Sequence, residues 1–302
     1  MTTAPVMEAT AVTHPLRGTV LVLISAASFG TTLIFTQRAI DGGVTLSALL
    51  LYRYIFGTIL LGVVAGGVRQ VLAVGERKWR LLLIGGLAQT AIAGLTVGAV
   101  TRIPAASVAF LFYTYPTWVA LLAIVRRTET VDRWNAAALA LSLAGTATIV
   151  GNPVASNLDP RGVALALTAA VVYAVLIPWL AKIQDKLKPA AAMTWIALGA
   201  AICFLVAALV LQTALMPVTS ALLINAGALA LIATTLAFTT FLAGLAILGP
   251  VRTSIVSTVE PFWTALLAGL VLGQAVGPRT WIGGAMIAAA MLVLQRKRAT
   301  SA

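Results

Sequence analysis

Residues 114–123 read TYPTWVALLA, and residues 259–268 read VEPFWTALLA. The two segments agree at six of ten positions at a constant offset of 145 residues, and they align Pro116 with Pro261. In a chain this apolar, composition raises the background of chance matches. A second, separate match is therefore needed before a duplication can be inferred.

That second match lies near the start of each half. Residues 18–35 align with residues 162–179 at an offset of 144. Two independent matches at almost the same offset indicate an internal repeat. We take residues 1–151 as the first copy and residues 152–302 as the second.

The composition is that of a membrane protein. Of the 302 residues, 61% are apolar and only 9% are charged. Soluble domains carry about 45–50% apolar and about 25% charged residues, and disordered chains are more polar still. About 20 apolar residues cross the hydrocarbon core as a helix. The predicted spans are 18–36, 45–67, 81–100, 105–125, 134–151, 162–181, 190–212, 221–243, 251–272 and 280–295.

The basic residues predict the orientation of these ten spans. With a cytoplasmic N-terminus, 15 of the 20 Lys and Arg residues fall in inner segments, and Arg53 lies inside the second span. This distribution follows the rule that cytoplasmic loops are enriched in positive charge, so we expect both termini in the cytoplasm. The four basic residues of the outer loops are Arg38, Arg102, Arg161 and Arg279.

The repeat has a consequence for function. Each half has five predicted spans, an odd number, so the second half must enter the membrane from the side opposite to the first. The predicted fold is therefore an all-α membrane protein of ten transmembrane helices in two inverted five-helix repeats. Inverted repeats are typical of secondary transporters, which bind their substrate near the membrane midplane and open to alternate sides. A duplicated bundle that serves only as a stable scaffold is the alternative.

The ten spans, the Pro-x-Trp-x-Ala-Leu-Leu-Ala segments and Arg53-Tyr54 resemble the EamA-type drug/metabolite transporter superfamily, and bacterial YddG-like amino-acid exporters within it. The resemblance implies a central cavity lined by the first, third, fourth, sixth, eighth and ninth spans. Members commonly carry Leu-Gly-Glu after the proline-bearing helices. This chain departs from that pattern, with Arg127-Thr128-Glu129 in the first half and Leu272-Gly273-Gln274 in the second.

Glu260 is predicted to lie near the middle of the ninth span. A carboxylate at that depth is costly unless it is paired, protonated or functional. Two interpretations remain open. Glu260 is either a proton-coupling or amine-binding group of the cavity, or a structural carboxyl bonded to backbone groups that Pro261 leaves free.

Arg53 is the second charge predicted within the membrane, about 12 Å along the second span. It is a candidate carboxylate-binding group or partner of Glu260. We favour a structural role in helix packing, because the family to which the resemblance points carries this arginine across varied substrates.

The other candidates lie on the spans that the resemblance assigns to the cavity. Pro116 and Pro261 occupy equivalent positions in the two halves and are predicted hinges of a gate. Aromatic and small polar side chains are predicted to form the cavity wall, although plain packing and backbone bonding remain alternatives. These residues are Phe29, Thr32, Gln89, Tyr113, Tyr115, Trp118, Tyr173, Trp179, Thr235, Phe238 and Trp263. The glycine pairs Gly62/Gly66, Gly94/Gly98 and Gly269/Gly273 are expected to pack helices within the bundle.

Several function classes are excluded by what the sequence lacks. It holds one His and one Cys, and it contains no HExxH, GxSxG or P-loop motif, so an enzyme is disfavoured. The net charge of +12 is spread over short loops and does not form a nucleic-acid-binding face.

We expect a monomeric secondary transporter in the bacterial inner membrane that exports amino acids or similar small metabolites. Its partners are a small-molecule substrate and the lipid bilayer, with protons as a candidate coupling ion and no cofactor or metal. The alternative is an exporter of drugs or other amphipathic metabolites with the same fold.

Overall fold

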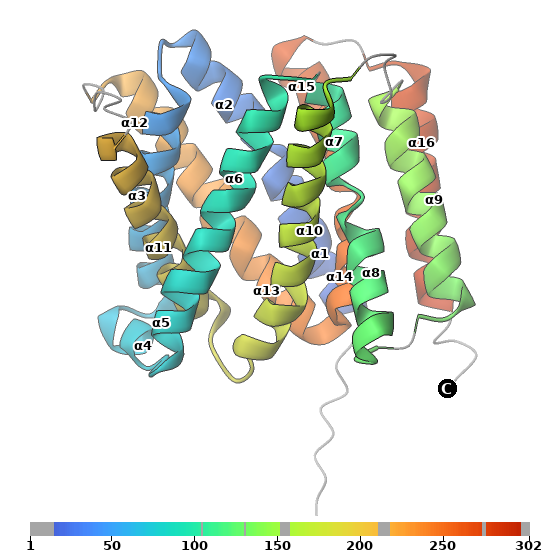
Figure 1. Ribbon diagram of the computed structural model, residues 1–302, viewed down its shortest axis with the longest axis horizontal. Helices are drawn as coiled ribbons and strands as arrows, with labels where there is room; N and C mark the ends of the chain where they lie inside the picture. Colours follow the sequence, from blue (N-terminus) through green and yellow to red (C-terminus); the bar gives the residue numbers. More distant parts are fainter. Residues whose placement is uncertain are drawn as a thin grey trace, which may run out of the picture.

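The computed structural model describes residues 15–103, 105–129, 131–151, 158–210, 218–273 and 276–296. Within these ranges every regular element is a helix, and the helices stand side by side in one bundle (Figure 1). The elements of the first half are α1 (Pro15–Gly30), α2 (Thr32–Asp41), α3 (Leu46–Ala65), α4 (Val68–Leu72), α5 (Arg77–Arg80), the π-helix η1 (Leu81–Gly85), α6 (Gly86–Val100), α7 (Ala105–Phe112), α8 (Tyr115–Arg126) and α9 (Arg133–Val150). Those of the second half are α10 (Pro160–Ile183), α11 (Pro189–Val210), α12 (Ser220–Ala228), the π-helix η2 (Leu229–Leu236), α13 (Ala237–Leu248), α14 (Pro250–Ser257), α15 (Glu260–Leu272) and α16 (Pro278–Arg296).

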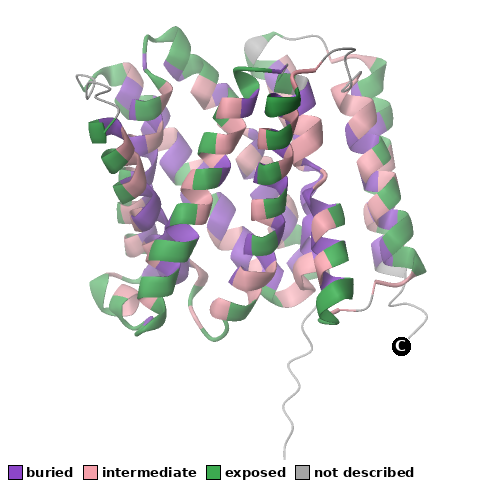
Figure 2. Cartoon of the chain, viewed as in Figure 1, coloured by how far each residue is buried: buried purple, intermediate pink, exposed green. Residues whose placement is uncertain are grey.

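Eight helical stretches in the described part of the chain are long and apolar enough to cross a membrane. They correspond to the predicted spans one to four and six to nine. The outward faces of the bundle carry large apolar side chains such as Val125 (70% exposed) and Leu270 (83% exposed), as a lipid-facing surface requires (Figure 2).

The predicted fifth and tenth spans coincide with α9 and α16. The polar first turn of α9, with Arg133 and Asn135, lowers its mean hydropathy. The apolar part of α16 covers Pro278–Leu294 and is shorter than the other spans. The all-helical fold is therefore confirmed for the described residues, whereas the count of ten spans stays a prediction.

Three of the spans are interrupted, and each interruption contains a threonine that bonds back to its own helix. The hydroxyls of Thr31, Thr114 and Thr258 donate to the carbonyl oxygens three residues earlier, at 2.7, 2.6 and 2.7 Å. Such bonds compete with the regular helical pattern and bend the axis. The breaks between α7 and α8 and between α14 and α15 lie at equivalent positions of the two halves.

The helices of the two halves interlock. The most extensive helix contacts join α9 with α16, α3 with α11, α1 with α13 and α6 with α10. Each of these pairs takes one helix from each half. The contact of α1 with α13 has its counterpart in that of α10 with α6, as expected for two copies related by an approximate two-fold axis.

Helices α9 and α16 run antiparallel and approach closely at two glycines. A Cβ atom added to Gly145 would lie 2.7 Å from the carbonyl oxygen of Gly283 and 2.8 Å from the side chain of Ile287. One added to Gly283 would lie 2.6 Å from the side chain of Ile149. As the residue numbers rise along α9, the numbers of the residues that it contacts in α16 fall, so the two helices are antiparallel.

The glycines predicted to pack helices do so only in part. Nothing lies within 4 Å of a Cβ built at Gly62, Gly94 or Gly273, so the expectation was wrong for these three. Gly273 instead ends α15 in the left-handed conformation (φ +68°), which glycine adopts without strain. Close approaches of backbone to backbone occur instead at Gly145 and Gly283, and at Gly86 and Gly199, where the small size of glycine is needed.

Both ends of the described chain lie on the same side of the bundle. Pro15 of α1 and Leu294 of α16 line one cavity together with Arg252, and we call this side the terminal face. An even number of membrane crossings places the two ends on one side. That the terminal face is cytoplasmic stays a prediction.

The two halves of the ninth span differ in burial. Six of the eight residues of α14 are buried, and this helix lies towards the terminal face. In α15, beyond the break, only Pro261 and Ala268 are buried among the residues whose burial is described. The bundle is thus packed more tightly around the ninth span on the terminal face.

Candidate functional site

Glu260 is the first residue of α15 and stands directly behind the break in the ninth span. The break leaves the N–H groups of the first turn of α15 without helical partners. A carboxylate at this end of a helix is favoured by the helix dipole. Pro261 follows at a position where its missing N–H removes no hydrogen bond. The local backbone therefore lowers the cost of placing a carboxylate at mid-span, where the sequence predicts it.

Tyrosines surround the Glu260 carboxylate. The Tyr113 hydroxyl lies within hydrogen-bonding reach of Glu260, and Tyr115 and Tyr173 are close enough to interact with it electrostatically. Arg53 also acts on Glu260 through its charge, but Glu260 makes no salt bridge with any described residue. The donor within reach of this carboxylate is thus the Tyr113 hydroxyl rather than a salt-bridged cation.

The same tyrosines form an aromatic cluster at the break between α7 and α8. The Tyr115 and Tyr173 rings meet edge to face at 4.8 Å, and Phe112 stacks on Tyr173 at 5.6 Å. Phe241 of α13 continues the cluster at 6.4 Å from Tyr173. Helices of both halves thus meet here, and three of the predicted cavity residues, Tyr113, Tyr115 and Tyr173, come together. Phe112 was not predicted, because an isolated phenylalanine in an apolar helix carries no distinguishing signal.

Arg53 of α3 is buried and bonds to the π-helix η2 of the second half. Its Nε donates to the Thr234 hydroxyl at 2.9 Å, and its Nη2 donates to the Ala233 carbonyl at 3.0 Å. Gly57, one turn further along α3, leaves room for this approach, because a Cβ there would lie 2.9 Å from the Thr234 methyl. These contacts are of the helix-packing kind that the sequence favours for Arg53.

Gln89, Thr235, Phe29 and Phe238 contribute further side chains. The Gln89 amide donates to the Tyr54 hydroxyl at 2.9 Å. The rings of Phe29 and Phe238 meet edge to face at 4.8 Å. Thr235 is buried, and its hydroxyl has no hydrogen-bond partner among the described residues. Thr32 is half-buried in the first turn of α2.

Unpartnered buried hydroxyls are uncommon in folded proteins and need an explanation. Besides Thr235, the described residues Ser25 of α1 and Thr253 of α14 also have them. Such groups are available to a polar ligand or to water. Thr253 was missed in the sequence because a threonine in an apolar helix usually bonds to its own backbone.

The three predicted tryptophans occupy different environments. The Trp118 indole donates to the Thr114 hydroxyl at 3.3 Å, and Trp118 and Trp179 both pack against the main core. Trp263 is 37% exposed and lies beside Gly30 of α1. The structure brings none of these rings into the tyrosine cluster among the ring contacts of described residues. Their place in a cavity wall stays a prediction.

Pro116 and Pro261 both lie in the first turn of the helix that follows a break. Proline is well tolerated there, because its ring pre-forms the helical φ angle and the first-turn N–H groups have no helical partner. The breaks themselves, with their threonines, supply the irregular backbone. A hinge role for the two prolines stays a prediction.

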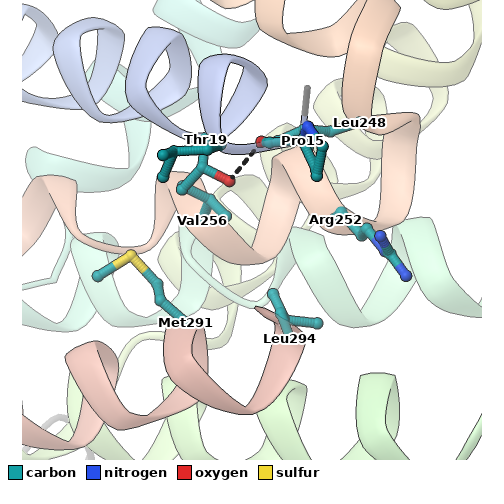
Figure 3. Close-up of a pocket in the computed structure, with 8 residues that line it drawn as sticks. Pro15, Thr19, Leu248, Arg252, Val256, Met291 and Leu294 are labelled. Carbon is teal, nitrogen blue, oxygen red and sulfur yellow. Dashed lines mark hydrogen bonds between the residues drawn. The ribbon is translucent and has the colours of Figure 1, made fainter. Parts of the chain in front are cut away.

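A cavity of about 250 Å³ opens between α1, α13, α14 and α16 on the terminal face (Figure 3). Its wall is mostly apolar, and Arg252 is its only charged residue. None of the predicted site residues lines it. The cavity thus lies outside the site around Glu260.

The chain was compared with known proteins. A protein-family model described as the EamA-like transporter family matches residues 16–151 and again residues 160–296. A solved structure described only as "Crystal structure of protein" is similar over 91% of this chain and 96% of its own, with a TM-score of 0.78 and 18% sequence identity. This likeness concerns the fold alone. The comparison with curated proteins gave no match.

Proposed function

Because the chain belongs to the EamA-like transporter family, we propose that it exports amino acids, aromatic and neutral ones in particular, and related small metabolites. The family consists of membrane transporters and not of enzymes. The proposed place of action is the bacterial inner membrane. The proposed mechanism is alternating access between the two halves.

One observation carries the proposal. A carboxylate without a salt bridge, Glu260, lies among the tyrosines Tyr113, Tyr115 and Tyr173 where helices of both halves meet. A carboxylate can hold an ammonium group, and aromatic faces attract cations and apolar side chains. Amino acids with an apolar or aromatic side chain combine both features.

The alternative substrate class is drugs or other amphipathic metabolites. The aromatic cluster favours it, because apolar contacts distinguish ligands by only about 1–3 kcal/mol per group. Extrusion of dyes from cells, against extrusion of labelled amino acids, separates the two classes.

The deciding experiment is flux of labelled amino acids in liposomes that contain the purified protein, with and without a pH gradient. Saturable flux that unlabelled phenylalanine reduces supports the amino-acid exporter. Dependence on the gradient supports proton coupling. Absence of flux for every amino acid, with dye transport intact, overturns the amino-acid assignment in favour of the alternative.

Glu260→Gln tests the proposed role of the acid. A charge-assisted hydrogen bond is worth about 1.5–3 kcal/mol, so we expect flux at low substrate concentration to fall by about tenfold or more. The matched control is Glu76→Gln, which changes an exposed glutamate and should leave flux unchanged. Flux that survives Glu260→Gln with its pH response intact refutes both proposed roles of Glu260.

A further inference from the structure

Glu129 lies in the connection between α8 and α9, and its carboxylate reaches across to the second half. It lies near the backbone N–H of Val251 and the charge of Arg252, both in the first turn of α14, and both act on it electrostatically. A Cβ added to Gly249 would lie 3.1 Å from Oε1 of Glu129. The carboxylate is therefore seated against the turn that joins α13 to α14.

The contact has a clear physical basis. The first N–H groups of a helix have no partner within it, and no side chain of the preceding residues caps α14. Pro250 supplies no N–H, so Val251 carries the first free donor of this helix. An acceptor oxygen placed there satisfies the donor. A residue of the first half thus provides the cap for a helix of the second.

The helix that begins at this cap is the most buried part of the ninth span. Six of the eight residues of α14 are buried, and α14 packs against α1, α8 and α13. In the ninth span, α14 lies between Glu260 and the terminal face. Opening a path between them requires α14 to separate from the first half, and separation breaks the contact with Glu129.

We infer that Glu129 is the latch of the gate at the terminal face: its acceptor oxygen fastens the start of α14 to the first half while that face is closed. The inference rests on the proposed transport by alternating access. It assigns to Glu129 a positioning role, because the residue lies outside the site around Glu260. In the sequence, Glu129 is the last residue of Arg127-Thr128-Glu129, which stands where the family commonly carries Leu-Gly-Glu.

The test measures opening without any substrate. Cys203 is the one cysteine of the chain, so it is first replaced by alanine, and a reporter cysteine is introduced at the buried Ser254 of α14. The reaction rate with a charged maleimide is then measured for the full chain in lipid nanodiscs. A second reporter, Thr264→Cys in α15, monitors the other half of the span. Ser257→Cys replaces the first reporter should that variant not fold.

Loss of a helix cap corresponds to about a fivefold change in such an equilibrium. We therefore expect Glu129→Ala to raise the labelling rate at residue 254 about fivefold and to lower the rate at residue 264. Glu129→Gln, the matched control, keeps an acceptor oxygen and should stay within about twofold of the parent.

Two results overturn the latch. Unchanged labelling at residue 254 in Glu129→Ala means that the contact does not hold the gate. Faster labelling at both reporters means that the residue only stabilises the fold. Because no transported substrate enters the measurement, failure of the amino-acid assignment leaves this test intact.

Discussion

The guanidinium of Arg53 connects two helices that are 180 residues apart in sequence, and its partners explain how a charge is kept inside the membrane. It donates to one hydroxyl and to one carbonyl of η2, whose π-helical turn belongs to the other half of the chain. Hydrogen bonds to a charged group in a protein interior are worth about 1.5–3 kcal/mol each. The residue therefore ties α3 to η2 as a packing element.

Arg53→Lys is expected to keep the charge but to lose the forked pair of hydrogen bonds, because an ammonium group cannot reproduce the guanidinium geometry. We expect a loss of about 2 kcal/mol in stability and a melting temperature lower by about 5 °C. Thermal unfolding in detergent measures this, with the exposed Arg69→Lys as control. An unchanged melting temperature together with weaker substrate binding would place Arg53 in the substrate site instead.

Burial raises the pKa of Glu129 above its ordinary value, although the Val251 N–H and the Arg252 charge act in the opposite direction. When the latch opens, the carboxylate regains water and its pKa returns towards the ordinary value. Protons are then bound more tightly in the closed state, so acidification stabilises closure. At pH values well above the raised pKa, Glu129 is charged in both states, and pH no longer changes the balance between them.

The labelling rate at residue 254 is measured in the parent and in Glu129→Gln, and the first rate is divided by the second. We expect this ratio to fall as the pH drops from about 8 to about 5. The ratio removes the pH dependence of the thiol reaction itself. A ratio that stays constant or rises on acidification contradicts the assignment of the titration to Glu129.

At this scale the sequence predicts the unusual residues better than their partners. Glu260 and Arg53 stand out because a charge within an apolar span is costly. Their surroundings come from helices more than a hundred residues away, and nothing local in the chain specifies them. The hydroxyl of Thr234 and the carbonyl of Ala233 could not be foreseen as the partners of Arg53.

Among the helices, the interruptions and close approaches matter more than the regular turns. The breaks after α7 and α14 recur at equivalent positions, and both halves carry a threonine there with a proline two or three residues later. The prolines marked these places in the sequence. The glycines that permit close approach were not identified, since a glycine facing lipid and a glycine facing a backbone look alike in one sequence.

Gly145→Ala is expected to force α9 away from α16, because its Cβ would lie 2.7 Å from the Gly283 carbonyl oxygen. Overpacking of this kind costs about 1–3 kcal/mol, so the melting temperature should fall by several degrees. Gly62→Ala is the matched control, a helical glycine with nothing within 4 Å of an added Cβ. Equal stability of the two variants would show that the helices can separate at no cost.

For the whole molecule, the sequence predicts the helical class and the duplication, while the orientation rests on loop charges alone. Single cysteines at Thr128, near the terminal face, and at Thr101, at the opposite end of the fourth span, test it in a Cys203→Ala background. Both positions are exposed. A membrane-impermeant maleimide added to intact cells should label residue 101 and reach residue 128 only after permeabilisation. The reverse pattern means that the chain is inserted the other way round.

The interlocked pairing of α1 with α13, α6 with α10, α3 with α11 and α9 with α16 bears on how such a chain arises and folds. The most extensive helix contacts run between the halves rather than within either one, so the two halves share one core. They are units of ancestry rather than of folding. Residues 1–151 and 152–302 made as separate chains should each be degraded, and together they should assemble. With the odd number of crossings predicted for each half, a single ancestral copy that made the same contacts would have had to insert into the membrane in both directions.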